Sequence, residues 1–89
     1  MPGPEPRPEL FVAVLRFAPD ATTDEHPDEL QVHEVVCLEG SGFTSIGDET
    51  ASIRAGQRVT WPRGVPHRLW TEADEMTTLM IGRAPREGE

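Results

Sequence analysis

The 89-residue chain contains no lysine and no tyrosine, and it has a single cysteine, Cys37. One cysteine cannot form a disulfide within the chain, so nothing in the sequence points to an oxidising compartment. The basic residues are eight arginines against sixteen acids, which gives a formal net charge of −8. This charge argues against a nucleic-acid partner, because phosphates require a basic surface.

Long hydrophobic runs are also missing. No apolar stretch approaches the roughly 20 residues that a membrane-spanning helix needs. The beginning of the chain carries prolines at positions 2, 4, 6 and 8 where a signal peptide would have a hydrophobic segment. We therefore expect a cytoplasmic protein with no membrane partner, and we expect residues 1–9 to form an unstructured, proline-rich arm.

The remaining chain is long enough for one domain, which we place at residues 10–85. No segment shows a helical period of apolar residues over 11 positions, whereas short apolar segments alternate with Gly, Pro and acidic turns such as those at residues 39–42 and 46–49. Several short strands separated in this way predict an all-β sandwich or barrel of antiparallel strands. The predicted strands are residues 10–17, 32–38, 50–53, 58–61, 67–71 and 77–82.

Three histidines are the first candidates for chemistry: His26, His33 and His67. If residues 25–28 are extended, His26 and Asp28 project from the same face and could reach one ion. Imidazole and carboxylate together suit Fe, Mn, Ni, Cu or Zn, and the residues do not choose among these metals. The alternative is that each histidine is an ordinary surface or hydrogen-bonded imidazole.

The spacing of these histidines resembles the two conserved motifs of the cupin family. The first cupin motif is a glycine, five residues, His-x-His, three or four residues, a glutamate, six residues and a glycine. Here the same spacing is kept while three of the five identities change, with the five positions occupied by Asp20, His26, Asp28, His33 and Gly40.

The second cupin motif is a glycine, five residues, Pro-x-Gly, two residues, a histidine, three residues and an asparagine. It is matched by Gly56, Pro62, Gly64 and His67, with Thr71 in place of the final asparagine. This match is the more specific of the two, because both the spacing and most identities are retained.

The resemblance implies a jelly-roll barrel, also called a double-stranded β-helix, that forms a homodimer. It also implies one divalent transition metal between the two motifs, with the ligand set His26, Asp28, His33 and His67. The subset His26, Asp28 and His67 has the composition of the two-histidine, one-carboxylate triad of non-haem iron oxygenases. Metal-free cupins also exist in the family, so an empty pocket is the alternative.

Two functions follow as hypotheses. The first is a metal-dependent, dioxygenase-like enzyme acting on a small organic molecule inside the barrel. Isomerase or cyclase chemistry would need an acid or base, for which Glu25 and Glu29 are the only candidates near the mouth; catalytic residues are otherwise unassigned. The second is a non-catalytic cupin that binds a metal or a small molecule.

Alternation along the strands predicts which other side chains line the interior. Starting from an inward His33, Val35 and Cys37 point inward while Val36 and Leu38 point outward. Cys37 is then interpreted as a small buried core residue, with a thiol near the metal site as the alternative. The outward apolar positions favour a dimer interface.

Overall fold

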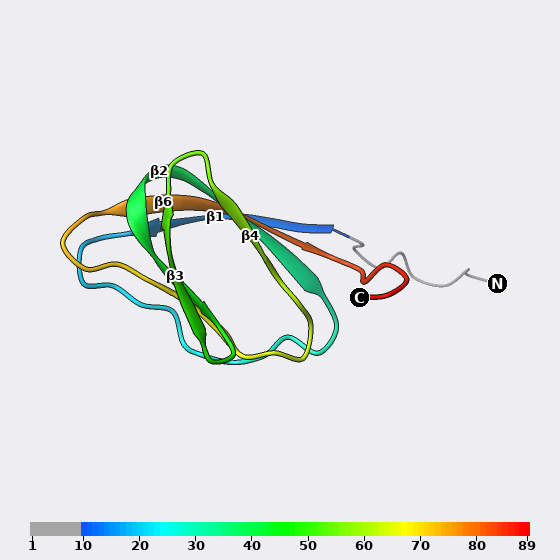
Figure 1. The fold of residues 1–89 in the computed structure, drawn as a ribbon. Coiled ribbons are helices and arrows are strands. Elements are labelled where there is room, and N and C mark those ends of the chain that lie inside the picture. The colour runs from blue at the N-terminus through cyan, green and yellow to red at the C-terminus, as the bar shows by residue number, and fades with distance from the viewer. Residues whose placement is uncertain (1–9) are drawn as a thin grey trace.

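The computed structural model describes residues 10–89, and within this range the chain forms six β-strands and no helix (Figure 1). The expected arm at residues 1–9 lies outside the described residues. All strand pairings are antiparallel, which confirms the all-β prediction. The strands are β1 (Leu10–Phe17), β2 (Val32–Ile46), β3 (Glu49–Arg54), β4 (Arg58–Trp61), β5 (His67–Trp70) and β6 (Met76–Arg83).

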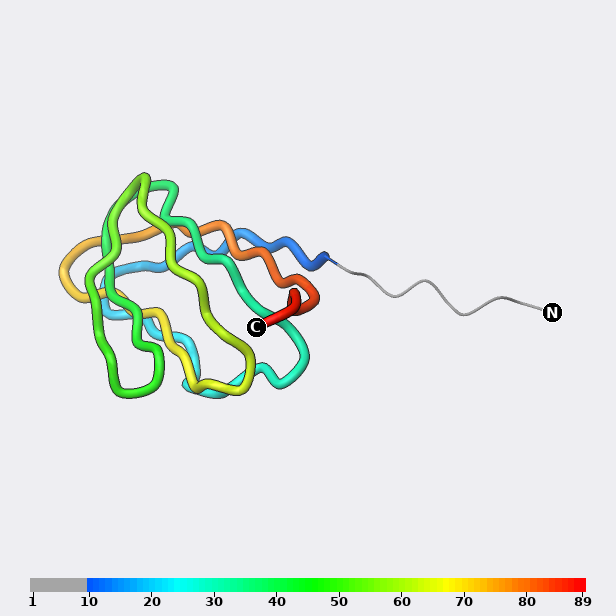
Figure 2. Tube along the Cα trace, turned by 45° about the vertical axis from the view of Figure 1, so that its right-hand side comes forward, coloured from blue at the N-terminus to red at the C-terminus, as the bar shows by residue number. Residues whose placement is uncertain are grey.

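Strand β2 is 15 residues long and organises the whole sheet. Its first half pairs with β6 and β4, and its second half pairs with β3 and β5. Strand β1 pairs only with β6 and therefore forms an edge. Figure 2 shows the beginning of β1 and the end of β6 at the same end of the molecule, as their antiparallel register requires.

The sequence prediction of a turn at residues 39–42 is wrong, because these residues continue β2. The pairing of β2 with β6 shifts register between Cys37 and Glu39, as in a β-bulge, and Gly40 has a φ of 75°. A side chain at Gly40 would also collide with the backbone carbonyl of Glu75. The glycine therefore marks a bend that carries one strand from one half of the barrel to the other.

The other predicted strands are confirmed to within one residue at each end, and β4 matches at both ends. The turn predicted at residues 46–49 is the two-residue hairpin between β2 and β3. Its first loop residue, Gly47, has a φ of 57°. The common two-residue hairpin turns need a positive φ at this position, and glycine adopts it without strain.

The core lies between the two halves of the barrel and receives buried side chains from all six strands. Strand β1 contributes one buried residue, Phe17, because the rest of this strand is exposed or only partly buried. Alternation placed Val35 and Cys37 inward correctly, and both are almost fully buried. The thiol of Cys37 donates hydrogen bonds to two backbone carbonyls, and burial raises its pKa. The buried apolar cluster consists of Phe17, Val35, Cys37, Ile53, Trp61, Leu69 and Met76.

No stretch of residues 10–89 forms a helix of the length and apolarity that crossing a membrane requires.

Candidate metal and ligand site

His33 lies on β2 between two neighbouring strands, opposite Trp61 of β4 and Gly82 of β6. Its side chain points into the barrel and is 8% exposed. The absence of a side chain at Gly82 leaves room for the imidazole, since a Cβ there would lie 2.9 Å from its Cδ2 atom. Burial lowers the pKa of His33 below its ordinary value, which favours the neutral ring at pH 7.

His67 is the first residue of β5 and is 5% exposed. Its ring stacks on the indole of Trp61, with centroids 3.9 Å apart and planes 13° from parallel. The indole is itself held in place, because its Nε1–H donates a hydrogen bond of 3.0 Å to Thr44 Oγ1. Burial lowers the pKa of His67 to about 4, with smaller contributions from the nearby His33 and His26, so the ring is neutral at pH 7.

His26 comes from the loop between β1 and β2 and forms an isolated antiparallel bridge with His67. The ring centroids are 5.8 Å apart for His26 and His67 and 5.7 Å apart for His33 and His67. The structure therefore brings the three histidines together around one cavity of about 170 Å³. We call this the histidine cavity; it is lined by Thr23, Asp24, His26, His33, Trp61, His67 and Met80.

Asp28 lies next to this group but does not line the histidine cavity. Its Oδ1 accepts hydrogen bonds from the backbone N–H groups of Leu30 and Gln31, at 2.8 and 2.9 Å. Its Oδ2 lies 3.5 Å from His33 Nε2. Partial burial alone would raise the pKa of Asp28, but these two N–H groups and the neighbouring histidines hold it below its ordinary value. The carboxylate is therefore ionised, and its Oδ2 atom faces Nε2 of the His33 ring.

The histidine nitrogens are suitable metal ligands in their chemistry, although the imidazole rings lie slightly farther apart than two rings that bind one ion. His33 Nδ1 and His67 Nε2 are buried and have no hydrogen-bond partner in the described part of the chain, and a neutral imidazole nitrogen is a common metal ligand. Two imidazoles on one ion have centroids roughly 5 Å apart, since the metal–nitrogen bond is about 2.0–2.1 Å. Accordingly, among residues 10–89 no three His, Cys, Asp or Glu side chains are close enough together to hold an ion as they stand.

Residues 13–82 match the sequence profile of the Cupin domain family. The chain belongs to the cupin family. Among curated proteins, no match to this cupin is found.

Several solved structures share the fold of this chain, one of them a cupin protein. A cupin protein from Bacteroides fragilis has a TM-score of 0.83 at 17% identity, over 91% of this chain and 70% of that one. A protein from Thermus thermophilus has a TM-score of 0.81 at 22% identity, over 88% and 76% of the two chains. The polyketide cyclase RemF from Streptomyces resistomycificus has a TM-score of 0.75 at 26% identity, over 88% and 56%. These likenesses confirm the cupin fold and assign no activity.

One substituted position of the first motif has a backbone conformation that favours glycine. Asp20 stands where the family has a glycine, and it is the one non-glycine residue with a positive φ, 59°, in the described part of the chain. Aspartate adopts this left-handed conformation more readily than most residues. The motif spacing was therefore a better guide than its residue identities.

Four residues that line the histidine cavity were not predicted as site residues: Thr23, Asp24, Trp61 and Met80. Asp24 lines the cavity, and its position two residues before His26 would have predicted this, because alternate residues of an extended segment share a face. Met80 of β6 also lines it, and no sequence signal marks that role. Glu25 and Glu29, the candidate acids or bases, are exposed and are not among the lining residues.

Proposed function

We propose that this cupin binds one divalent transition metal through His26, His33 and His67, together with a small organic molecule in the histidine cavity. The observation that carries the proposal is that two residues lining one cavity each have a buried nitrogen, His33 Nδ1 and His67 Nε2, without a hydrogen-bond partner within residues 10–89. A buried polar atom without a partner costs free energy, and a bound metal offsets that cost.

The protonation state of the histidines supports metal binding at neutral pH. A metal competes with protons for an imidazole nitrogen. A ring that is already neutral therefore binds the ion without the free-energy cost of first releasing a proton. The pKa of His67, lowered to about 4 chiefly by burial, keeps that nitrogen unprotonated over the physiological range. The pKa of His33 is shifted in the same direction for the same main reason.

In this proposal Asp28 either orients a metal-binding imidazole or binds the metal itself. Its Oδ2 atom faces His33 Nε2 at 3.5 Å, which suits a carboxylate that orients a metal-binding imidazole through its second nitrogen. It is also the fourth ligand that the family motif implies. We favour the orienting role, because Oδ1 is already engaged by two backbone N–H groups and the side chain is not part of the cavity wall.

The size of the histidine cavity limits the organic ligand. A volume of about 170 Å³ accommodates roughly five or six atoms larger than hydrogen, given about 30 Å³ for a water molecule. A metal there would supply Lewis-acid or oxygen-activating chemistry. The side chains of Trp61 and Met80 provide an apolar wall, and the carboxylate of Asp24 provides a polar group at the rim.

Within this proposal we favour a metal-dependent, dioxygenase-like enzyme located in the cytoplasm. Three histidines leave coordination positions open for a substrate, as catalytic sites require. Cyclase or isomerase chemistry is a further candidate, since one of the similar structures is a polyketide cyclase; Asp24 would then be the nearest acid or base. The alternative is a non-catalytic module in which the metal site is closed by a fourth protein ligand.

Elemental analysis of the purified, untagged chain tests the proposal after separate loading with Fe(II), Mn(II), Ni(II), Cu(II) and Zn(II). We expect one equivalent of at least one metal, retained in Glu29→Gln as a matched control and lost in His67→Gln and His26→Gln. Circular dichroism establishes that each variant is folded. If the wild-type chain retains none of the five metals, or if both histidine variants retain the metal fully, the proposal is wrong.

A further inference from the structure

The histidine cavity carries a negative charge at its opening and no arginine in its wall. Apart from the three imidazoles, the only titratable group among the described residues that line the cavity is the carboxylate of Asp24. Asp24 is exposed, whereas His33 and His67 are buried. The carboxylate therefore lies at the opening, where an entering molecule meets it.

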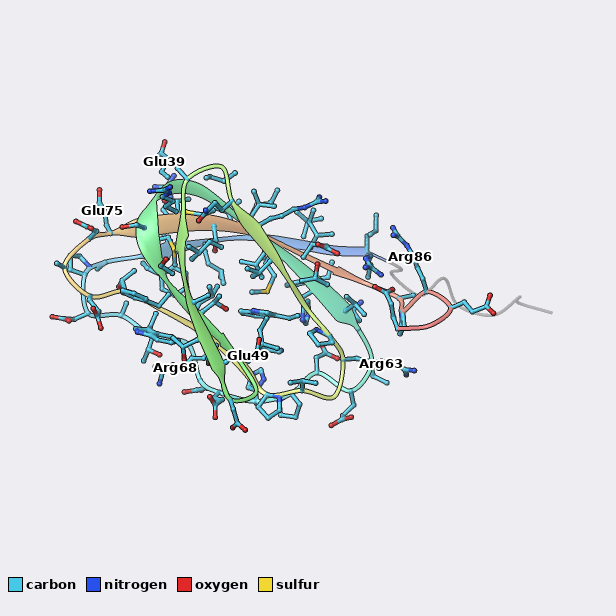
Figure 3. The ribbon with its side chains drawn as sticks, viewed as in Figure 1. Glu39, Glu49, Arg63, Arg68, Glu75 and Arg86 are labelled. Carbon is cyan, nitrogen blue, oxygen red and sulfur yellow. The ribbon has the colours of Figure 1, made fainter. Side chains whose placement is uncertain are left out.

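Arg68 of β5 is directed away from the histidine cavity. It follows His67, and successive side chains of a strand point to opposite faces of the sheet. The guanidinium carbon of Arg68 lies 4.0 Å from the centroid of the Trp70 ring, as in a cation–π contact. Figure 3 shows Arg68 on the outside of the barrel. The positive charge of Arg68 is therefore not available to a molecule inside the cavity.

Two further arginines near the site are held by acceptors outside the cavity. Arg83, at the end of β6, forms ion pairs with Glu34 at 3.1 Å and with Glu89 at 2.6 Å. Arg63, in the turn between β4 and β5, donates a hydrogen bond of 3.3 Å from Nε to the backbone oxygen of Glu89, and Figure 3 shows it pointing away from the barrel. No arginine of residues 10–89 lines the cavity, so an anionic molecule there has no guanidinium partner among them.

The loop between β1 and β2, which contributes Asp24 and His26 to the cavity wall, is acidic throughout. Residues 18–31 include no arginine or lysine, and their acids are Asp20, Asp24, Glu25, Asp28 and Glu29. Charges of one sign around an opening attract ions of the opposite sign and repel ions of the same sign. Salt screens exposed charges beyond about 8 Å, so the acids nearest the opening, Asp24 first, decide this effect.

We propose that the small molecule of the histidine cavity is a primary amine, held as an ammonium ion by the carboxylate of Asp24. This inference rests on the proposed function, and it adds the charge of the ligand and the residue that selects it. The carbon atoms of the amine pack against the apolar wall formed by Trp61 and Met80. The cavity volume of about 170 Å³ limits the ligand to a chain of about two to four carbons.

An ammonium group fits this opening better than a neutral or an anionic group does. It donates up to three hydrogen bonds, and a hydrogen bond between two charged groups is stronger than one between neutral groups. A hydroxyl group keeps only the weaker hydrogen bond to Asp24. A carboxylate group would lie beside a like charge with no arginine to offset it. Because a bound metal would itself attract an anion, the effect of Asp24 is measured by comparing variants in the same metal state.

Ethanolamine, ethylene glycol and glycolate form a matched series of probes, because each has two carbons and a hydroxyl group, and the other end is an amine, a hydroxyl or a carboxylate. NMR signals of the Met80 methyl group and the Trp61 indole N–H report their binding to the full chain, first treated with a chelator and then loaded with Zn(II). In the chelator-treated wild type, ethanolamine should bind about fivefold more tightly than ethylene glycol, and glycolate should bind most weakly. Asp24→Asn should remove the preference for ethanolamine over ethylene glycol in both metal states. Glu25→Gln is the matched control, because it removes a neighbouring exposed charge that does not line the cavity, and it should keep the preference.

A second variant and the metal content separate this inference from the proposed function. Asp24→Lys should reverse the order and favour glycolate, and circular dichroism verifies that each variant is folded. The amine assignment is overturned if the chelator-treated wild type binds glycolate as tightly as ethanolamine, if Asp24→Asn keeps the preference, or if none of the probes shifts either signal. A chain that retains the metal and fails in this way overturns the amine assignment alone. A chain that retains no metal but prefers ethanolamine through Asp24 overturns metal binding and supports the amine assignment.

Discussion

Replacing Gly82 with alanine should destabilise the protein through one identified contact. Gly82 lies on β6 beside His33, and an added Cβ would lie 2.9 and 3.0 Å from the Cδ2 and Nε2 atoms of that ring. It would also lie 2.6 Å from Oε1 of Gln31, at the end of a flexible side chain that can move. The His33 ring is more confined, because it is buried and meets Trp61 edge-on, with centroids 6.2 Å apart.

The size of the effect follows from two opposing contributions. Gly82 does not have a positive φ, so alanine without any collision would stabilise the native state by about 0.4–1 kcal/mol through the unfolded chain. Overpacking a well-filled site costs about 1–3 kcal/mol. The net expectation is a loss of about 1–2 kcal/mol in the free energy of unfolding. At roughly 4–8 °C per kcal/mol for a domain of this size, the melting temperature should fall by roughly 5–15 °C.

A double-mutant cycle identifies the contact responsible. Gly82→Ala is introduced into the wild type and into His33→Ala, and the free energy of unfolding is measured by urea denaturation in both backgrounds. In the His33→Ala background the collision is removed, so the alanine at position 82 should be neutral or stabilising. An equal loss of stability in the two backgrounds would refute the reasoning, because the cost would then not arise at the His33 ring.

Three further predictions concern single residues. Asp20→Gly should raise the free energy of unfolding by about 0.5–1 kcal/mol and Asp20→Ala should lower it, because only the glycine relieves the positive φ of 59°; urea denaturation that shows the reverse order contradicts this. Thr44→Val should cost about 1–3 kcal/mol by leaving the buried indole N–H of Trp61 without an acceptor, whereas Thr44→Ser should cost much less. Hydrogen bonds from the Arg83 side chain, and secondly from the Arg86 backbone N–H, lower the pKa of Glu89 from 4.5 to about 2, so their stabilising contribution is complete above pH 4.5 and is lost as the pH falls toward 2; an NMR titration should show that Arg83→Gln raises this pKa toward its ordinary value.

The cupin spacing predicted the proximity of the three histidines more reliably than the motif identities suggested. His26, His33 and His67 occupy three of the expected ligand positions, and the structure gathers them around one cavity even though the first motif departs from the family at three of its five positions. Spacing along strands determines which residues reach the same level of a barrel, and that geometry does not depend on the identity of each side chain. The orienting role that we propose for Asp28 rests instead on its hydrogen bonds to nearby backbone, which spacing does not reveal.

The sequence by itself determined the strand positions apart from the second half of β2, the inward alternation of residues such as Val35, and membership of the cupin family. These properties depend on local patterns of period two and on turn residues, which are written in consecutive positions. The tertiary structure alone decided the bend of β2 at Gly40 and the stacking of His67 on Trp61. Each of these depends on contacts between segments far apart in the chain, and such contacts exist only once the sheet has closed.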